Sequence, residues 1–225
     1  MQTQDLHAHW AVRLHSAFEW VLWVATVNAL WYLFALAGGI LLGTAPASVA
    51  AAELTRRRLR GEGFRTLPAF ASAWRREFVR ANLVVGPVHL VLALLATAVL
   101  GRFRADAVGS AWSAAALVAL AVTAVIAALL VPLYVEYDLP LRSYLGVTVR
   151  WMAANLAHVA LLIAVAAAIV VASALVPGII PFLSLGAWIT ASTALCLAFF
   201  AANERRLEEN ARLASASTAR PASLN

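Results

Sequence analysis

Four long stretches of this sequence contain no Asp, Glu, Lys or Arg: residues 20–52, 81–101, 107–135 and 151–203. A helix that crosses the hydrocarbon core of a bilayer needs about 20 apolar residues. The first three stretches therefore hold one crossing helix each. The last holds two, because Pro177 and Gly178 interrupt helical structure near its middle. Helices are required because hydrocarbon offers no hydrogen-bond partner to a free backbone group.

The chain is therefore predicted to be an all-α membrane protein with five transmembrane helices. Its composition agrees, because 63% of residues are hydrophobic and only 12% are charged, against about 25% charged in soluble domains. The sequence predicts a polar N-terminal segment at 1–17, a single transmembrane domain at 18–203 and a charged, then disordered tail at 204–225. The predicted spans are residues 18–42, 82–100, 110–134, 153–176 and 182–202.

The distribution of arginine predicts the orientation, because cytoplasmic connections carry an excess of basic residues. All seventeen basic residues are Arg. Fourteen of them lie in the connection at 43–81, in the connection before the fourth span, or in the tail. Five spans place these segments and the C-terminus in the cytoplasm and the N-terminus outside. A re-entrant pass by residues 44–55 would instead place both termini inside.

The basic connection at 43–81 is predicted to contain two interfacial helices. Proline is tolerated in a first helical turn, so the first helix begins at Pro46 and ends near Gly61. Its far end carries the arginine cluster, which consists of Arg56, Arg57, Arg58 and Arg60. Next to the anionic lipids of an inner leaflet, such a cluster predicts membrane anchoring rather than nucleic-acid binding.

The second interfacial helix is predicted over residues 66–81. Large apolar side chains, Trp74 and Phe78 among them, recur there at helical spacing, and arginines occupy the rest of the circumference. Aromatic anchors with basic neighbours are typical of a helix that lies in the membrane surface.

A weak internal repeat accompanies these helices. Thr-Leu-Pro at 66–68 precedes Ala-Asn-Leu at 81–83, and Asp-Leu-Pro at 138–140 precedes Ala-Asn-Leu at 154–156 with nearly the same spacing. The repeat predicts one span followed by two similar units, each with an interfacial helix and a helical hairpin. Internal repeats of this kind occur in many transporter folds.

Five polar residues lie inside the predicted spans or at their ends: Asn28, Asn82, His89, Asn155 and His158. Polar residues in a membrane either line a functional cavity or bond one helix to another, and both interpretations stay open here. The Gly39–Gly43 pair permits close helix approach, within the chain or between chains.

Chemical motifs are absent from the sequence. It has no phosphate-binding glycine loop, no nucleophilic serine elbow and no pair of zinc-binding histidines on a helix. Cys196 is the only cysteine, so no intrachain disulfide forms. We therefore expect no catalytic site, no metal site and no cofactor, and we expect that the protein is not an enzyme.

Four segments follow one another in a distinctive order: Val-Asn-Ala-Leu-Trp at 27–31, Gly-Thr-Ala-Pro-Ala-Ser-Val-Ala at 43–50, Arg-Arg-Leu-Arg-Gly-Glu at 57–62 and Tyr-Asp-Leu-Pro-Leu-Arg at 137–142. These segments resemble the YesL family of bacterial integral membrane proteins, whose function is unknown. Trp74, Phe78, Ala81 and Asn82 also match the family pattern, whereas Ser48 replaces the usual Thr.

The resemblance implies a bacterial cytoplasmic-membrane protein, because members of the family often lie beside genes for carbohydrate ABC importers. The first functional hypothesis is an accessory partner of ABC permease subunits. Its contact surface would be built from Pro46, the arginine cluster, Trp74 and Phe78. The alternative is a self-contained carrier or channel for a small solute, lined by the intramembrane Asn and His residues. The oligomeric state is left open.

Overall fold

The computed structural model describes residues 2–105, 109–176 and 180–218, and it contains only helices over those residues. Five of its helices are long and apolar enough to cross a membrane: His15–Ala37, Gly86–Arg104, Ala111–Glu136, Leu156–Leu175 and Phe182–Leu213. The predicted all-α membrane fold with five candidate spans is therefore confirmed.

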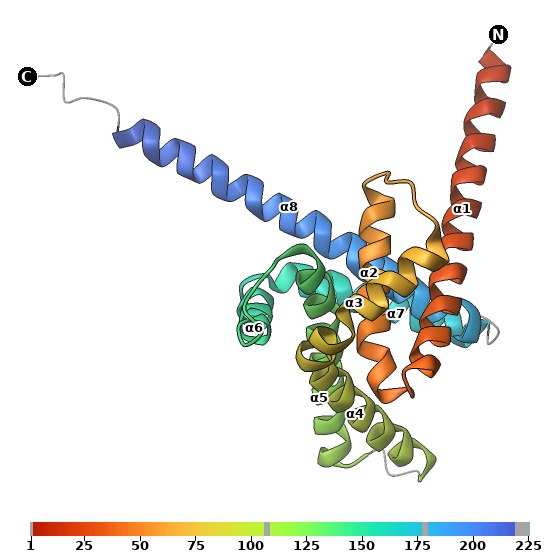
Figure 1. Ribbon diagram of the computed structural model, residues 1–225, viewed down its shortest axis with the longest axis vertical. Coiled ribbons are helices and arrows are strands. Elements are labelled where there is room, and N and C mark those ends of the chain that lie inside the picture. Colours follow the sequence, from red (N-terminus) through yellow and green to blue (C-terminus); the bar gives the residue numbers. More distant parts are fainter. Residues whose placement is uncertain (1, 106–108, 177–179, 219–225) are drawn as a thin grey trace, which may run out of the picture.

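The elements follow one another with short connections (Figure 1). They are α1 (Gln2–Ala37), α2 (Leu41–Leu59), α3 (Thr66–Val84), α4 (Gly86–Arg104), α5 (Ala111–Glu136), α6 (Tyr144–Ala154), α7 (Leu156–Leu175), the π-helical turn η1 (Ile180–Ser184) and α8 (Leu185–Thr218).

The first hairpin joins α1 to α2 through a tight turn of three residues. Gly39 has a φ of 72°, a conformation that glycine adopts without strain, and Ile40 follows with a φ of 64°. The chain therefore reverses before Pro46, and α2 begins at Leu41 rather than at the predicted Pro46. The predicted helix start is too late in the chain, because the first helix ends at the glycines before Leu41 and not at the proline.

Helix α2 returns along α1 (Figure 1). A Cβ atom on Gly43 would lie 2.7 Å from the Cα atom of Ala35, so only glycine permits this approach. The Gly39–Gly43 pair thus serves a contact within the chain. At the other end of the hairpin, the Arg58 guanidinium lies 4.9 Å from the Trp23 ring and 5.3 Å from the Trp20 ring.

The antiparallel hairpin bears on topology. Because Arg58 lies against Trp20 and Trp23, the basic end of α2 and the early part of the first span are at the same end of the molecule. This arrangement matches the re-entrant alternative, in which both chain termini share one side of the membrane. An N-terminus on the opposite side from the arginine cluster does not fit it, although α2 is not one of the five helices that are long and apolar enough to cross a membrane.

Helix α2 is the centre of the fold and not an interfacial helix. Nearly all of its residues from Gly43 to Thr55 are buried, and it contacts α1, α3, α4, α5 and α8 (Figure 1). Its inner face is made of small residues, which allows its neighbours to approach closely in the absence of a hydrophobic driving force between membrane helices.

Two units with the same order of elements follow α2. In each, a shorter helix (α3 or α6) leads into a hairpin of two long helices (α4–α5 or α7–α8). The junctions match as well: the Asn82 amide donates to the Phe78 carbonyl at 2.7 Å, and the Asn155 amide donates to the Trp151 carbonyl at 2.9 Å. The architecture therefore follows the predicted repeat.

Helix α8 crosses behind α1 and α2 instead of running beside them (Figure 1). At the crossing with α1, the Gly186 backbone N–H donates to the Asn28 Oδ1 atom at 3.0 Å. A Cβ atom on Gly186 would lie 2.9 Å from the Asn28 Cβ atom and would clash with the Val24 carbonyl oxygen. Glycine is therefore required where the two helices meet.

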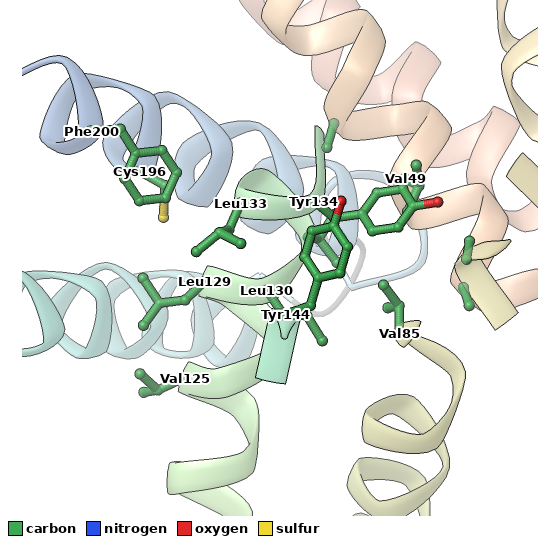
Figure 2. Close-up of a cluster of buried hydrophobic side chains, with 14 of the residues drawn as sticks. Val49, Val85, Val125, Leu129, Leu130, Leu133, Tyr134, Tyr144, Cys196 and Phe200 are labelled. Carbon is green, nitrogen blue, oxygen red and sulfur yellow. The ribbon is translucent and has the colours of Figure 1, made fainter. Parts of the chain in front are cut away.

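Further along, α8 packs on the second half of α5 (Figure 2). Pro132 has no N–H to donate to the Ala128 carbonyl one turn earlier, and the Cys196 thiol lies 3.7 Å from that oxygen. The buried cysteine thus partly replaces a missing helical hydrogen bond. Beside it, the Tyr134 and Tyr144 rings pack with centroids 5.1 Å apart.

The chain ends differ from the predicted boundaries. Helix α1 begins at Gln2, so most of the polar segment at 1–17 continues the first span as one helix. Helix α8 likewise runs unbroken to Thr218, well past residue 204, where the charged tail was predicted to begin. The predicted disorder at 219–225 lies outside the described residues.

Candidate functional site

A cavity of about 730 Å³ lies between the α1–α2 turn, α4, α5 and α8. We refer to it as the apolar cavity. Leu, Ile, Val, Ala and Pro side chains form most of its wall, and none of its lining residues is charged. Its volume falls within the range of about 300–1,000 Å³ that is usual for small-molecule sites.

Asn82 stands at the edge of this cavity, and its amide nitrogen donates to the Leu42 carbonyl at 2.8 Å. That carbonyl needs a donor because Pro46, one turn later in α2, has no N–H. Sequence analysis assigned Pro46 to a partner surface and Asn82 to the intramembrane polar residues, and the structure makes both parts of one hydrogen-bonding arrangement.

His89 also lines the apolar cavity, one turn into α4. Among the described residues, its imidazole has no hydrogen-bond partner. Among the other polar side chains of the wall, Trp31 donates to Ser48 at 2.9 Å, and Ser192 donates to the Ile189 carbonyl at 3.2 Å. The Trp188 indole N–H and the buried Thr193 hydroxyl have no partner among the described residues. The cavity therefore offers very few open hydrogen-bonding groups.

The other predicted polar residues lie elsewhere. Asn28 is buried at the α1–α8 crossing, and Asn155 caps the junction of α6 and α7. His158 stacks on Phe199, with ring centroids 3.9 Å apart, and also on Trp151. The structure thus brings Asn82 and His89 together at one cavity and keeps Asn155 and His158 apart from it.

Next to the apolar cavity, a cluster of ion pairs joins α2, α3 and the end of α5. Arg56 and Arg60 both donate to Glu136, at 3.2 Å and 2.9 Å. Arg76 pairs with Glu53 at 2.5 Å and with Glu77 at 3.0 Å. These pairs surround a small polar hollow of about 250 Å³ that Val49 and Tyr134 also line.

Two tyrosines and Arg80 extend this cluster. Arg80 donates to Asp138 at 2.6 Å, and this hydrogen bond raises the pKa of the guanidinium. The Tyr134 hydroxyl donates to Glu77 at 2.7 Å. Burial and a 2.7 Å hydrogen bond to Glu204 raise the pKa of the Tyr137 phenol, which links α5 to α8.

The residues predicted as a partner surface are mostly engaged inside the chain. Pro46 is buried in α2. Arg57 pairs with Glu62 at 2.9 Å and lies over the Phe64 ring. Trp74 packs between Phe34 and Phe78, so these aromatic residues fasten α3 to α1. Within the predicted surface, Arg60 is the side chain that stays about half exposed.

Sequence reasoning missed the ion-pair cluster as a unit. Glu136 is the last residue of α5, but its partners lie far earlier in the chain. Charge balance is the signal that the sequence offers, because acidic residues are scarce in it. Three of them are Glu53 and Glu77, which lie in segments rich in Arg, and Glu136, which ends a long run without charged residues.

Comparisons with known proteins agree with a membrane protein whose function is unknown. A family model described as "Protein of unknown function, DUF624" matches residues 24–98. The "Uncharacterized protein YesV" of Bacillus subtilis (strain 168) is 34% identical over 137 residues, which cover 59% of this chain and 64% of YesV. The chain thus matches less than two thirds of the length of that relative. No solved structure matches significantly. The chain is therefore similar to YesV, and its residues 24–98, from α1 into α4, are similar to the DUF624 family model.

Proposed function

We propose that this chain is a non-enzymatic accessory protein of a bacterial cytoplasmic membrane that binds the permease subunits of a carbohydrate ABC importer. The observation that carries the proposal is a row of small residues on the outward face of α7. The row consists of Ala160, Ala164, Ala168 and Ala172, and all four are exposed.

Residues four positions apart lie on one face of a helix, so the four alanines form a continuous shallow ridge. Lipid tails are as apolar as leucine, and membrane helices therefore associate where small residues let their backbones approach closely. Within its own chain α7 fully buries only Leu162 and Ser173 among its described residues. A permease helix packed on the ridge would cover the face that the fold leaves open.

The resemblance to the YesL family supplies the kind of partner, since its members are encoded beside carbohydrate ABC importers. In this proposal the arginine cluster and the C-terminus face the cytoplasm, as the excess of arginine favours. The first span starts on the same side, because α2 returns along α1.

Affinity purification of the tagged chain from its native membrane in mild detergent tests the proposal. We expect mass spectrometry to find ABC permease subunits. The double variant Ala164→Leu with Ala168→Leu should reduce their recovery at least about tenfold, which corresponds to 1.4 kcal/mol. Ala98→Leu is the matched control, because Ala98 is exposed on α4 and lies outside both the ridge and the apolar cavity.

If the double variant recovers permease subunits as well as the unmodified chain does, α7 is not the contact. Recovery of the tagged chain alone would contradict the accessory role and favour the alternative, a self-contained carrier. The apolar cavity with Asn82 and His89 is the observation that supports this alternative. Solute flux into reconstituted vesicles without any partner protein would then be the measurement to make.

A further inference from the structure

We propose that the apolar cavity is a binding site for one uncharged lipid whose polar end is a single hydroxyl group. The hydroxyl would lie between Asn82 and His89, and the hydrocarbon part would lie against α4, α5 and α8. This site is independent of the proposed contact with a permease, because that contact involves α7, and no residue of α7 lines the cavity.

The walls exclude a charged ligand. No Asp, Glu, Lys or Arg lines the cavity, and burying an unpaired charge in such surroundings costs far more than any hydrogen bond returns. The ion-pair cluster lies beyond the cavity on the other side of α2, and its acidic and basic groups are paired with one another.

The walls also exclude a free sugar. A sugar carries many hydroxyl groups, and each hydroxyl left without a partner in an apolar site is costly. Thr44 donates to the Leu41 carbonyl at 3.3 Å, and Trp31, Ser48 and Ser192 are likewise bonded within the protein. Besides Asn82 and His89, the Trp188 N–H and the buried Thr193 hydroxyl are without a partner among the described residues, so the cavity offers fewer open groups than a sugar has hydroxyls.

The open groups fit one hydroxyl. The Asn82 amide nitrogen is used twice, toward Leu42 and Phe78, while its Oδ1 atom accepts no hydrogen bond from the described residues. The unpaired imidazole of His89 offers a donor and an acceptor. A hydroxyl donates once and accepts up to twice, so Asn82 Oδ1 and His89 together can satisfy it.

A photoreactive long-chain alcohol that carries a diazirine tests the site. The full chain is reconstituted in phosphatidylcholine vesicles with a trace of this probe, irradiated and digested, and the labelled peptides are mapped. We expect labels to concentrate on the cavity-facing parts of α4, α5 and α8, and we expect unlabelled hexadecanol to compete. Hexadecane should compete about threefold to tenfold less well, because it lacks the hydroxyl.

Two variants separate the site from ordinary lipid contact. Ala93→Trp places a large side chain in the cavity from an exposed position on α4, and it should abolish the concentrated labelling. Ala98→Trp, on the same helix outside the cavity, should leave it intact. His89→Phe keeps the aromatic shape but removes the hydrogen bonds, so hexadecanol and hexadecane should then compete equally.

The proposal would be overturned if the labels spread evenly over the exposed face of α7 as well as the cavity and Ala93→Trp did not change them. Such labelling would report only the surrounding lipid. Equal competition by hexadecanol and hexadecane in the unmodified protein would also overturn it, because the hydroxyl would then contribute nothing. The buried thiol of Cys196 verifies that each variant is folded, since a folded chain protects it from maleimide.

Discussion

Gly186→Leu is expected to produce a large loss of stability. At this position α8 crosses α1, and even a Cβ atom would clash with the Val24 carbonyl oxygen. The new side chain would push the helices apart and break the hydrogen bond from the Gly186 N–H to Asn28. Overpacking together with a buried amide left unpaired costs about 2–5 kcal/mol.

The single cysteine provides the measurement. Cys196 is fully buried between α8 and α5, so a fluorescent maleimide reacts with it only when the packing of these helices opens. Thermal scans in detergent should show reaction at a clearly lower temperature for Gly186→Leu. Gly146→Leu is the control, because Gly146 lies within α6 and nothing stands within 4 Å of its missing Cβ atom. Equal scans for the two variants would mean that α1 and α8 do not meet at Gly186.

Asn82→Leu is expected to destabilise the protein by about 1–3 kcal/mol, and Pro46→Ala is expected to remove most of that loss. The leucine variant keeps the approximate size of the side chain but leaves the Leu42 carbonyl without its donor. Alanine at position 46 restores a backbone N–H one turn after Leu42, so the carbonyl regains a partner within α2. The effects of the two changes should therefore be strongly non-additive.

The same thiol-protection scans measure this double-mutant cycle. Asn155→Leu combined with Pro46→Ala is the matched control, because Asn155 occupies the equivalent junction of the second unit and bonds only to Trp151 among the described residues. Those two effects should add. Additive effects for Asn82 and Pro46 would show that the amide does not replace the hydrogen bond that the proline lacks.

The membrane-spanning helices were predictable from the sequence because the pattern that marks them, a long run without charged residues, is local. Every long run without a charged residue contains most of at least one long helix, and Pro177 and Gly178 lie in the interval that separates α7 from η1 and α8. The junctions at Asn82 and Asn155 were predictable for the same reason, since the repeat around them lies within short segments of chain.

Helix α2 was not predictable in the same way. Its residues are small or weakly polar, and only the helices around it show that the small face is buried. In sequence, Pro46 looked like the start of a helix, because the donor that lets a proline sit inside α2 comes from Asn82 in another helix. The ion pairs of Glu136 likewise depend on where α5 ends relative to α2, which no local pattern reveals.

The apolar cavity escaped prediction for a related reason. The sequence groups His89 and Asn82 with His158 and Asn155 as intramembrane polar residues, and only the packing shows that the first two line the cavity and the other two do not. The wall needs α8 to cross the molecule, so the cavity exists only once the contact between Gly186 and Asn28 is made.

The unbroken length of α8 has a mechanical consequence. The helix runs from its contact with Asn28 at Gly186, past the tether between Glu204 and Tyr137, and on to Thr218. The part beyond Glu204 is about 22 Å long and is exposed wherever its side chains are described. A tilt of about 10° would therefore carry its far end through about 4 Å. Because the helix is unbroken, a change of packing around Gly186 that tilted it would produce its largest displacement at the far end.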